Sequence, residues 1–533
     1  MGKINSSGGA GRGNRGQAVI DDPDRPDCPL CGSFMKSGGK RWKCTEPECG
    51  KEILKVTHDQ SIKKFNDSLG FDRDKAEAHA LKCTKGKRLL VTSAQNNSEA
   101  AVKCWKTLKN IAKHYKCNIA VMSSHYRNRD ETKLDPDMVK EFDPLLEDYM
   151  VAGDFQFNNV MLRADARIRP TTLNPLSGKQ AHGGPLWQIF GHPQTSLEPV
   201  ATNGTFPKKM YTTGSITLPN YEKGDAGAKA EFHHTMSCLI LEKYNDHFTF
   251  VRQISFDENG HAYDLDLKFT SRTVTPGQRA EAITPGDEHV KWNICEKPIY
   301  GKRGLVDLLK PRYIVSHDIL DGYAGSHHHL RDPMIQFQKH HSGDNDYRKE
   351  LEECVDFLNR TTPEDSIRVI VPSNHHDHLK QFLDKADVNK DHTNALLICE
   401  LQAAMREKAL KGEDYDPFKL YVEPKLTCRY KFLNRNEPFF IGPPECQVDH
   451  SQHGDVGSNG SRGSARNLEK NPHRVTIGHS HSARIFRGVY QTGTSTGRLE
   501  YERGISDHST SLVVQYWGGK RAVIDIYDGK YRL

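Results

Sequence analysis

Short apolar runs rich in β-branched residues recur along the second half of the chain, and a cluster of aspartate, asparagine or histidine closely follows each. The clearest runs are RYIVS (312–316), IRVIVP (367–372) and HRVTIG (473–478). Such runs predict buried strands, and the residues after them lie where loops converge on one edge of a sheet. We therefore expect the polar clusters to meet in space.

The hydrophobic pattern changes along the rest of the chain. Residues 88–95 and 117–125 read as strands, and an amphipathic helix over 98–115 separates them, which predicts a parallel β-α-β unit. Short alternating runs between about 150 and 280, punctuated by Gly, Pro and Asn, predict mainly antiparallel strands. Strands alternating with helices, and a final set of antiparallel strands, predict an α/β (α+β) class with a layered sandwich.

Length and composition predict several domains in a chain of 533 residues. We expect a disordered tail (1–26), a small front domain (27–85), an accessory α/β and antiparallel β region (86–280) and a C-terminal domain (281–533). No apolar run is long enough to span a membrane and no signal peptide is evident, so a soluble, cytoplasmic protein is expected. An oligomer is compatible with this composition.

The front domain combines paired cysteines with positive charge. Cys28 and Cys31 form one pair and Cys44 and Cys49 a second, a spacing that can close a tetrahedral structural Zn²⁺ site. The segment resembles the zinc ribbons of transposase-like and topoisomerase-like DNA-binding proteins. Residues 59–83 then read as two short helices around a turn, which fits a helix-turn-helix or a plain helical linker.

Charge is concentrated in this front part of the chain. The whole chain has 75 Lys+Arg and 69 Asp+Glu, and residues 28–90 hold 14 of the basic and 8 of the acidic residues. This excess favours contact with a nucleic acid, DNA first, through residues such as Lys40 and Arg41. A solvated basic surface is the alternative.

The polar clusters of the second half contain the residue types that bind divalent cations. Carboxylate, imidazole and amide groups gathered on one sheet edge suit a pair of such ions. In chain order they are Asp287, His289, Asp318, Asp321, Asn374, His375, His453, His479 and His481.

By these residues the segment 280–533 resembles the calcineurin-like metallophosphoesterase superfamily, whose motifs run D-x-H, GD-x-x-D, GNH-[DE], H and GH-x-H. The resemblance implies a layered αββα sandwich and two divalent cations, Mn²⁺ first, with Mg²⁺, Fe²⁺ or Zn²⁺ as alternatives. It implies that His375 protonates the leaving oxygen, and Asp321 is a second candidate catalytic residue. The implied ligands are Asp287, His289, Asp318 and His481 for one ion, and Asp318, Asn374, His453 and His479 for the other.

Three features depart from the family's pattern. His317 replaces a glycine before Asp318, and His376 is inserted between His375 and the acid of the third motif. The single-histidine motif lies in VDHSQHGD, where His453 is preferred to His450 because a Gly-rich turn follows it.

A nearer resemblance is to phage-encoded DNA transfer proteins and pre-early nucleases that degrade host DNA. It is carried by LLVTSAQNN, EFHHT, SHDILDGYAGSHHH, HGDVGSNGSRGSARN and YQTGTST, and it extends from about Arg88 to the C-terminus. It implies a DNase acting in the host cytoplasm. The Gly/Ser/Asn-rich loop SNGSRGSARN between His453 and His479 places Arg462 and Arg466 where we expect them to contact backbone phosphates beside the site. A solvated loop is the alternative for these arginines. A phosphomonoesterase such as a protein phosphatase, and a non-catalytic DNA-binding or DNA-transfer protein, are the alternative functions.

Overall fold

The computed structural model describes most of the chain after residue 69 and short stretches before it. The described ranges are 35–38, 41–47, 49, 52–54, 70–126, 141–204, 206–326, 329, 332–499 and 502–533. They belong to two compact units, Met1–Ser68 and Leu69–Leu533. No described helix is both long and apolar enough to cross a membrane.

The described part of the front unit is a small antiparallel sheet. Its strands are β1 (Met35–Gly38), β2 (Arg41–Cys44) and β3 (Glu52–Leu54). Cys44 ends β2, and its sulfur accepts a hydrogen bond from the Glu46 amide at 3.4 Å. Cys28, Cys31, Lys40 and the predicted tail lie outside the described residues, as does the Arg41 side chain, so the zinc site stays a prediction.

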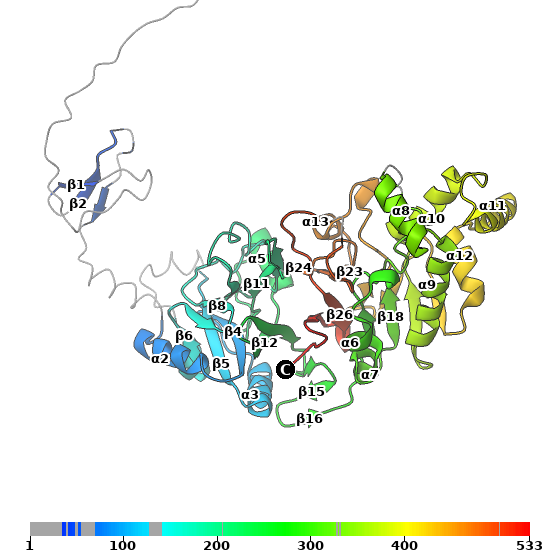
Figure 1. The fold of residues 1–533 in the computed structure, drawn as a ribbon. Helices are drawn as coiled ribbons and strands as arrows, with labels where there is room; N and C mark the ends of the chain where they lie inside the picture. Colours follow the sequence, from blue (N-terminus) through cyan, green and yellow to red (C-terminus); the bar gives the residue numbers. More distant parts are fainter. Residues whose placement is uncertain are drawn as a thin grey trace, which may run out of the picture. The chain divides into compact units, whose positions relative to one another are not determined.

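The larger unit contains two lobes, which we define as the first lobe (residues 70–275) and the second lobe (residues 276–533). Figure 1 shows the first lobe in blue through teal to green and the second lobe in green through yellow to red. Mixed sheets combined with helices confirm the predicted α/β (α+β) class.

The first lobe is built on a five-stranded sheet. Its strands in spatial order are β13 (Phe248–Ser255), β12 (Ser237–Asn245), β4 (Arg88–Gln95), β5 (Asn118–Ser124) and β6 (Met150–Val151). β4 and β5 are parallel and joined by α3 (Val102–Tyr115), which confirms the predicted β-α-β unit. Trp105, Leu108 and Ile111 of α3 are buried, so its apolar stripe faces the core.

Helix α2 (Arg73–Cys83) belongs to this lobe, although the sequence analysis grouped it with the front domain. It buries Ala76, Ala80 and Cys83, and His79 Nε2 lies 2.8 Å from the Ile119 carbonyl of β5. The first helix of the helix-turn-helix alternative would lie outside the described residues.

The second lobe is built on a six-stranded sheet. In spatial order its strands are β20 (Tyr430–Phe432), β19 (Ile367–Ile370), β18 (Tyr313–Ser316), β17 (Ala282–Thr284), β26 (Ser511–Gln515) and β27 (Arg521–Asp525). β17 to β20 are parallel, whereas β26 and β27 form an antiparallel pair beside them.

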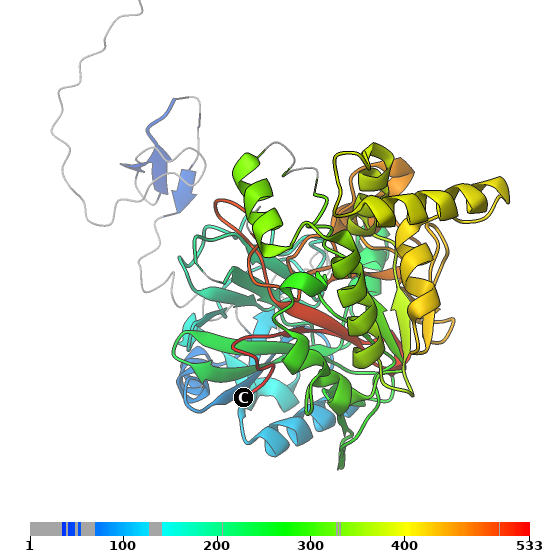
Figure 2. The same cartoon turned by 45° about the vertical axis from the view of Figure 1, so that its right-hand side comes forward.

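Several helices of the second lobe gather on one side of its strands (Figures 1 and 2). Leu351, Leu379, Leu397 and Phe418, each from a different helix, share a buried cluster with Ile370 of β19. The helices are α9 (Tyr347–Thr361), α10 (Asn374–Lys385), α11 (Ala395–Leu410) and α12 (Pro417–Val422), with α6 (Glu296–Tyr300), α7 (Leu305–Leu309), α8 (Pro333–Ser342) and α13 (Ala465–Leu468) elsewhere in the lobe.

A ten-stranded sheet runs through both lobes. The first lobe supplies β7 (Phe155–Phe157), β8 (Val160–Arg163), β9 (Trp187–Phe190), β11 (Lys208–Thr212) and β10 (Leu197–Val200). The second supplies β24 (Arg484–Phe486), β25 (Val489–Gln491), β23 (Arg474–Ile477), β22 (Val448–Asp449) and β21 (Phe440–Ile441). The halves meet where β10 pairs antiparallel with β24, at Leu197 and Ile485.

Most strand pairs formed within residues 150–280 are antiparallel, as the sequence predicts. The exceptions in this range are the parallel pairs β8–β9 and β9–β11. The EFHHT segment ends helix α5 (Asp225–His233) rather than lying in a strand. Alternation of polar and apolar residues predicts a strand but carries no information on the direction of its neighbour.

The two lobes repeat one topology. In each half of the ten-stranded sheet the pair directions run antiparallel, parallel, parallel, antiparallel from the outer edge inward. In each smaller sheet an antiparallel strand pair, β12–β13 or β26–β27, flanks a row of parallel strands. Residues 86–280 are therefore mostly a structural counterpart of the C-terminal region and not an unrelated accessory part.

A shared core and a buried ion pair hold the lobes together. One hydrophobic cluster contains Val91 and Leu239 of the first lobe with Ile485 and Val513 of the second. Lys209 Nζ of β11 donates to the carboxylate of Asp525 on β27, and both side chains are nearly inaccessible.

Replacing Lys209 by methionine should lower the free energy of unfolding by about 3–5 kcal/mol, because Asp525 would keep a buried, uncompensated charge. Urea denaturation of the metal-free protein measures the change. Lys380→Met removes a half-exposed ion pair with Asp384. It should lower the free energy of unfolding by less than about 1 kcal/mol. Equal effects of the two substitutions would contradict a stabilising role for the buried pair.

Candidate metal centre

The predicted ligands follow the carboxyl ends of four strands. Asp287, Asp318 and Asn374 come shortly after β17, β18 and β19, which are neighbours in the parallel part of the six-stranded sheet. His479 follows β23 of the ten-stranded sheet. Adjacent parallel strands bring the residues after them to one edge, so segments far apart in sequence meet at one place.

One group of side chains lies around Asp287 and Asp318. His481 Nε2 is 3.6 Å from Asp287 Oδ2 and 3.1 Å from His289 Nε2. His289 Nε2 is 3.9 Å from Asp318 Oδ2. These four residues are the set expected to hold the first cation.

A second group lies on the other side of Asp318. His453 Nε2 is 3.1 Å from Asp318 Oδ2 and 3.0 Å from Asn374 Oδ1. His479 Nδ1 is 3.1 Å from the same Asn374 oxygen. The structure thus brings the second expected set together as well, with Asp318 common to both.

The buried carboxylates of Asp287 and Asp318 are suited to bind divalent cations. All four carboxylate oxygens of Asp287 and Asp318 are buried, and none forms a well-oriented hydrogen bond with the described residues, although His453 Nε2 lies 3.1 Å from Asp318 Oδ2. Burial and the neighbouring Asp318 carboxylate raise the pKa of Asp287 to about 6. Burial disfavours a charged His453, but Asp318 outweighs it and raises the pKa of His453 to about 9. Cations between the carboxylates would satisfy these oxygens and relieve their repulsion.

The backbone at the site is strained. Four of the seven predicted ligands have positive φ angles: His289 (34°), Asp318 (42°), His479 (74°) and His481 (52°). Non-glycine residues rarely adopt this region, and such outliers gather at functional sites. Gly478 precedes His479 because a Cβ there would collide with Oδ1 of Asp287.

Two carboxylates orient ligand histidines. Asp321 Oδ1 is 2.9 Å from His289 Nδ1, and its other oxygen accepts from Trp292 Nε1 at 3.2 Å. Glu502 Oε1 lies 3.2 Å from His481 Nδ1, and its second oxygen lies 2.9 Å from His508 Nδ1. Each contact points the Nε2 atom of the ligand ring into the site. This geometry gives Asp321 a positioning role, and the sequence analysis missed Glu502.

His375 lies beside the metal centre and lines an open cleft. Its Nδ1 is 2.8 Å from the Asp321 backbone carbonyl. The cleft has a volume of about 740 Å³ and is also lined by Trp292, Tyr323, Arg498 and Arg503. Burial opposes a charge on His375, but the carboxylates of Asp318 and Asp321 together raise its pKa above the usual value.

A buried glutamate supports the loop after Asp321. Glu350 of α9 accepts hydrogen bonds from the amides of Gly322, Tyr323 and Ala324 at 2.7, 3.2 and 3.0 Å. Lys339 of α8 donates to the Tyr323 carbonyl and lies 4.1 Å from the centre of its ring. This wall of the cleft is therefore held by two buried charged side chains.

The departures from the family's motifs have structural explanations. His453 lies in the site, whereas His450 is buried elsewhere, with its Nε2 2.7 Å from Gln515 Oε1. His317 packs against His453, the two Nδ1 atoms 3.3 Å apart. His376 points into the core, where it stacks on Phe418 at 4.1 Å and accepts from the Ile319 amide at 3.2 Å.

The candidate DNA-contacting arginines are exposed. Arg462 forms an isolated bridge with Val456 in the loop after His453. Arg466 is the second residue of α13, and its guanidinium lies 5.7 Å from the centre of the Phe486 ring. Neither contact involves a predicted metal ligand. The role of the two arginines in binding DNA stays a prediction.

The first lobe carries the same scaffold without the same ligands. Ser93 bridges Ser215 in parallel as Asp287 bridges Thr494, so Ser93 matches Asp287. By the same alignment His479 has a counterpart in the first lobe, His192, but the carboxylates and the other histidines are replaced. The matched pairs are Ser93 with Asp287, Gln95 with His289, Ser123 with Asp318, His192 with His479 and Gln194 with His481.

All groups of described residues that could hold a metal ion lie in the second lobe. The repeat was visible in the sequence as two pairs of segments, IFGHPQ with TIGHSH and YTTGSIT with YQTGTST. These segment pairs share only a few identical residues. They indicate a repeat only because the strands around them have the same order and directions in both lobes.

Protein A1 of Escherichia phage T5 is 31% identical to this chain over 472 residues, which cover 84% of this chain and 83% of the T5 protein. No family model matches the chain. No solved structure matches it either.

Replacing Asp318 by alanine should abolish the binding of both cations, because its carboxylate belongs to both groups. Mass-spectrometric metal analysis after loading with Mn²⁺ should find about two ions in the parent protein and none in the variant. His340→Ala removes an exposed histidine of α8 and should leave the metal content unchanged. Retention of two ions by Asp318→Ala would rule out the bridging role.

Glu502→Gln should weaken Mn²⁺ binding by about 10–100-fold, because His481 would lose the carboxylate that orients it. Isothermal titration calorimetry on the metal-free protein measures the affinity. Glu407→Gln, at an exposed position on α11, is the matched control. An affinity for Mn²⁺ equal to that of the control would show that Glu502 does not position the ligand.

Proposed function

The chain belongs to the family of Protein A1 of Escherichia phage T5, and we propose that it is a two-metal phosphodiesterase that cleaves DNA. We also propose that its second lobe is a layered αββα sandwich of the calcineurin-like metallophosphoesterase type. The front unit would add a zinc ribbon that helps to hold the nucleic acid.

The observation that carries the proposal is the pair of overlapping ligand groups that share Asp318. Seven side chains from five segments meet where strands of the two sheets end, and the buried oxygens of Asp287 and Asp318 form no well-oriented hydrogen bond with described residues. Divalent cations bound there would acidify a shared water and withdraw charge from the phosphate oxygens. Mn²⁺ suits this mixed set of carboxylate, amide and imidazole ligands.

The roles of the protein side chains follow from their positions. Asp318 would hold both cations at a fixed separation, while Asp321 and Glu502 keep the rings of His289 and His481 in place. His375 donates from Nδ1 to the Asp321 carbonyl, which leaves Nε2 as the ring nitrogen available to the cleft. In its protonated form that nitrogen can give a proton to the leaving oxygen.

The cleft supports a nucleic-acid substrate. Trp292 and Tyr323 line it with their rings 5.3 Å apart in an edge-to-face arrangement. Aromatic faces of this kind can stack on bases, and Arg498 and Arg503 offer positive charge for backbone phosphates. A phosphomonoesterase that acts on a small substrate has less need of a cleft of this volume lined in this way.

The proposal is tested by incubating the purified protein and Mn²⁺ with linear duplex DNA, circular single-stranded DNA and RNA. We expect cleavage of DNA that EDTA abolishes. His375→Ala should lower the turnover about 10²–10⁴-fold while the metal content stays at the parent level. His340→Ala, which removes an exposed histidine, should cleave DNA at the parent rate.

Two results would contradict the proposal. If the protein hydrolyses a phosphomonoester rapidly but leaves all three nucleic acids intact, the substrate class is wrong. If His375→Ala cleaves DNA at the parent rate, the leaving oxygen receives its proton from another group.

A further inference from the structure

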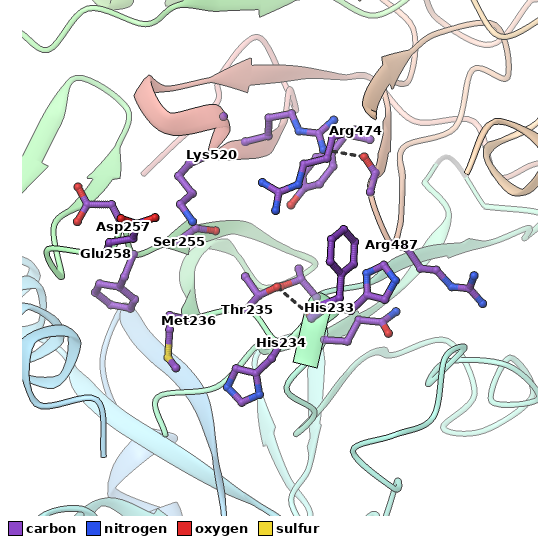
Figure 3. Close-up of a pocket in the computed structure, with 18 residues that line it drawn as sticks. His233, His234, Thr235, Met236, Ser255, Asp257, Glu258, Arg474, Arg487 and Lys520 are labelled. Atoms are coloured by element: carbon purple, nitrogen blue, oxygen red, sulfur yellow. Dashed lines mark hydrogen bonds between the residues drawn. The ribbon is translucent and has the colours of Figure 1, made fainter. Parts of the chain in front are cut away.

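A second cavity lies between the two lobes, away from the metal centre (Figure 3). Its volume is about 250 Å³. The first lobe supplies the end of α5 and the segment 255–258 after β13, and the second supplies Arg474, the turn at Arg487 and the β26–β27 hairpin. Arg474 begins β23 whereas His479 follows its other end, so the cavity and the metal centre lie at opposite ends of one strand.

Positive charge predominates among the side chains that line this cavity. Four of them are arginine or lysine, and two are acidic, Asp257 and Glu258. Asp257 is already engaged, because its carboxylate accepts from the amides of Asn259 and His261 at 2.9 and 2.8 Å. The cavity therefore has an excess of positive charge that its own carboxylates do not balance.

Two of the basic side chains have hydrogen-bond donors that no described residue engages. In the described part of the chain, the side chains of Arg474 and Lys520 form neither a hydrogen bond nor an ion pair. Arg487 donates to Glu469 through one terminal nitrogen, but its Nε is buried without a partner. Figure 3 shows Lys520 between the acidic end, at Asp257 and Glu258, and the basic end, at Arg474 and Arg487.

The fourth basic group is a buried guanidinium without a carboxylate partner. Arg521 is 4% exposed, donates to the carbonyls of Val475 and Gly488 at 2.6 and 2.7 Å, and lies 4.1 Å from the centre of the Tyr490 ring. Neutral acceptors satisfy its donors but leave its charge uncompensated. Burial, with Arg474 nearby, lowers the pKa of Arg521 to about 9. An anion in the cavity would offset this cost.

We propose that this cavity binds a small phosphate-bearing ligand, with the phosphate at Arg474, Arg487 and Lys520 and the hydroxyl groups of the ligand toward Asp257 and Glu258. Arginine and lysine donors form charge-assisted hydrogen bonds with phosphate oxygens. Because both lobes line the cavity, the bound ligand bridges them and stabilises their contact. This site is independent of the two-cation chemistry proposed above.

Calorimetric titration of the full chain in the presence of EDTA tests the proposal. EDTA keeps cations out of the metal centre, so binding there does not contribute. The probes are inorganic phosphate, ribose 5-phosphate and dAMP. We expect all three to bind, with ribose 5-phosphate and dAMP tighter than phosphate because only they carry hydroxyl groups for the acidic end.

The double variant Arg474→Ala/Lys520→Ala should bind dAMP at least about tenfold more weakly, because two charge-assisted contacts are lost. Both side chains reach solvent, and Arg521, which holds β23, stays in place. Arg272→Ala/Lys411→Ala removes two exposed charges elsewhere and should bind like the parent. Absence of binding by the parent protein, or parent-like affinity in the Arg474/Lys520 variant, would overturn the proposal. Equal affinities for the three probes would contradict the proposed contacts between the hydroxyl groups of the ligand and the carboxylates of Asp257 and Glu258.

Discussion

Two carboxylates, Asp287 and Asp318, are buried side by side where strands of the second lobe end, and their oxygens form no well-oriented hydrogen bond with the described residues. Burying two like charges together is costly unless cations balance them. Several features of the surrounding structure accommodate the two carboxylates and the histidines beside them. The backbone takes left-handed conformations at four predicted ligands, a glycine makes room for Asp287, and Asp321 and Glu502 hold the neighbouring imidazoles.

The internal repeat shows which parts of this arrangement belong to the scaffold and which to the site. Both lobes have the same strand order in their halves of the ten-stranded sheet, matching bridges at or just after their first parallel strand, and a glycine-histidine pair after the corresponding strand of the large sheet. In the first lobe serine and glutamine replace the carboxylates and most of the imidazoles. The scaffold therefore forms without the buried charges, and the candidate metal centre is an addition that only one lobe carries.

The same topology places two different polar sites at opposite ends of β23. At its carboxyl end His479 joins a centre that is rich in carboxylates and suits cations. At its amino end Arg474 joins a cavity in which arginine and lysine predominate and which suits anions. The lobes touch along β10 and β24, across the Lys209–Asp525 pair and around this cavity, so the second site depends on their packing.

The sequence by itself determined the elements and the chemistry of the candidate ligands. Apolar runs predicted β18, β19 and β23, the β-α-β unit at the start of the first lobe was correct, and the order of aspartates, histidines and asparagine singled out the side chains that meet. These features are local, because periodicity and residue type are properties of neighbouring positions. Only the tertiary structure decided which strand pairs in residues 150–280 are parallel, the exclusion of His450 from the site, the positioning role of Glu502 and the match of strand order between the two lobes. Each of these depends on contacts between residues far apart in the chain, which a single sequence does not encode in any local pattern.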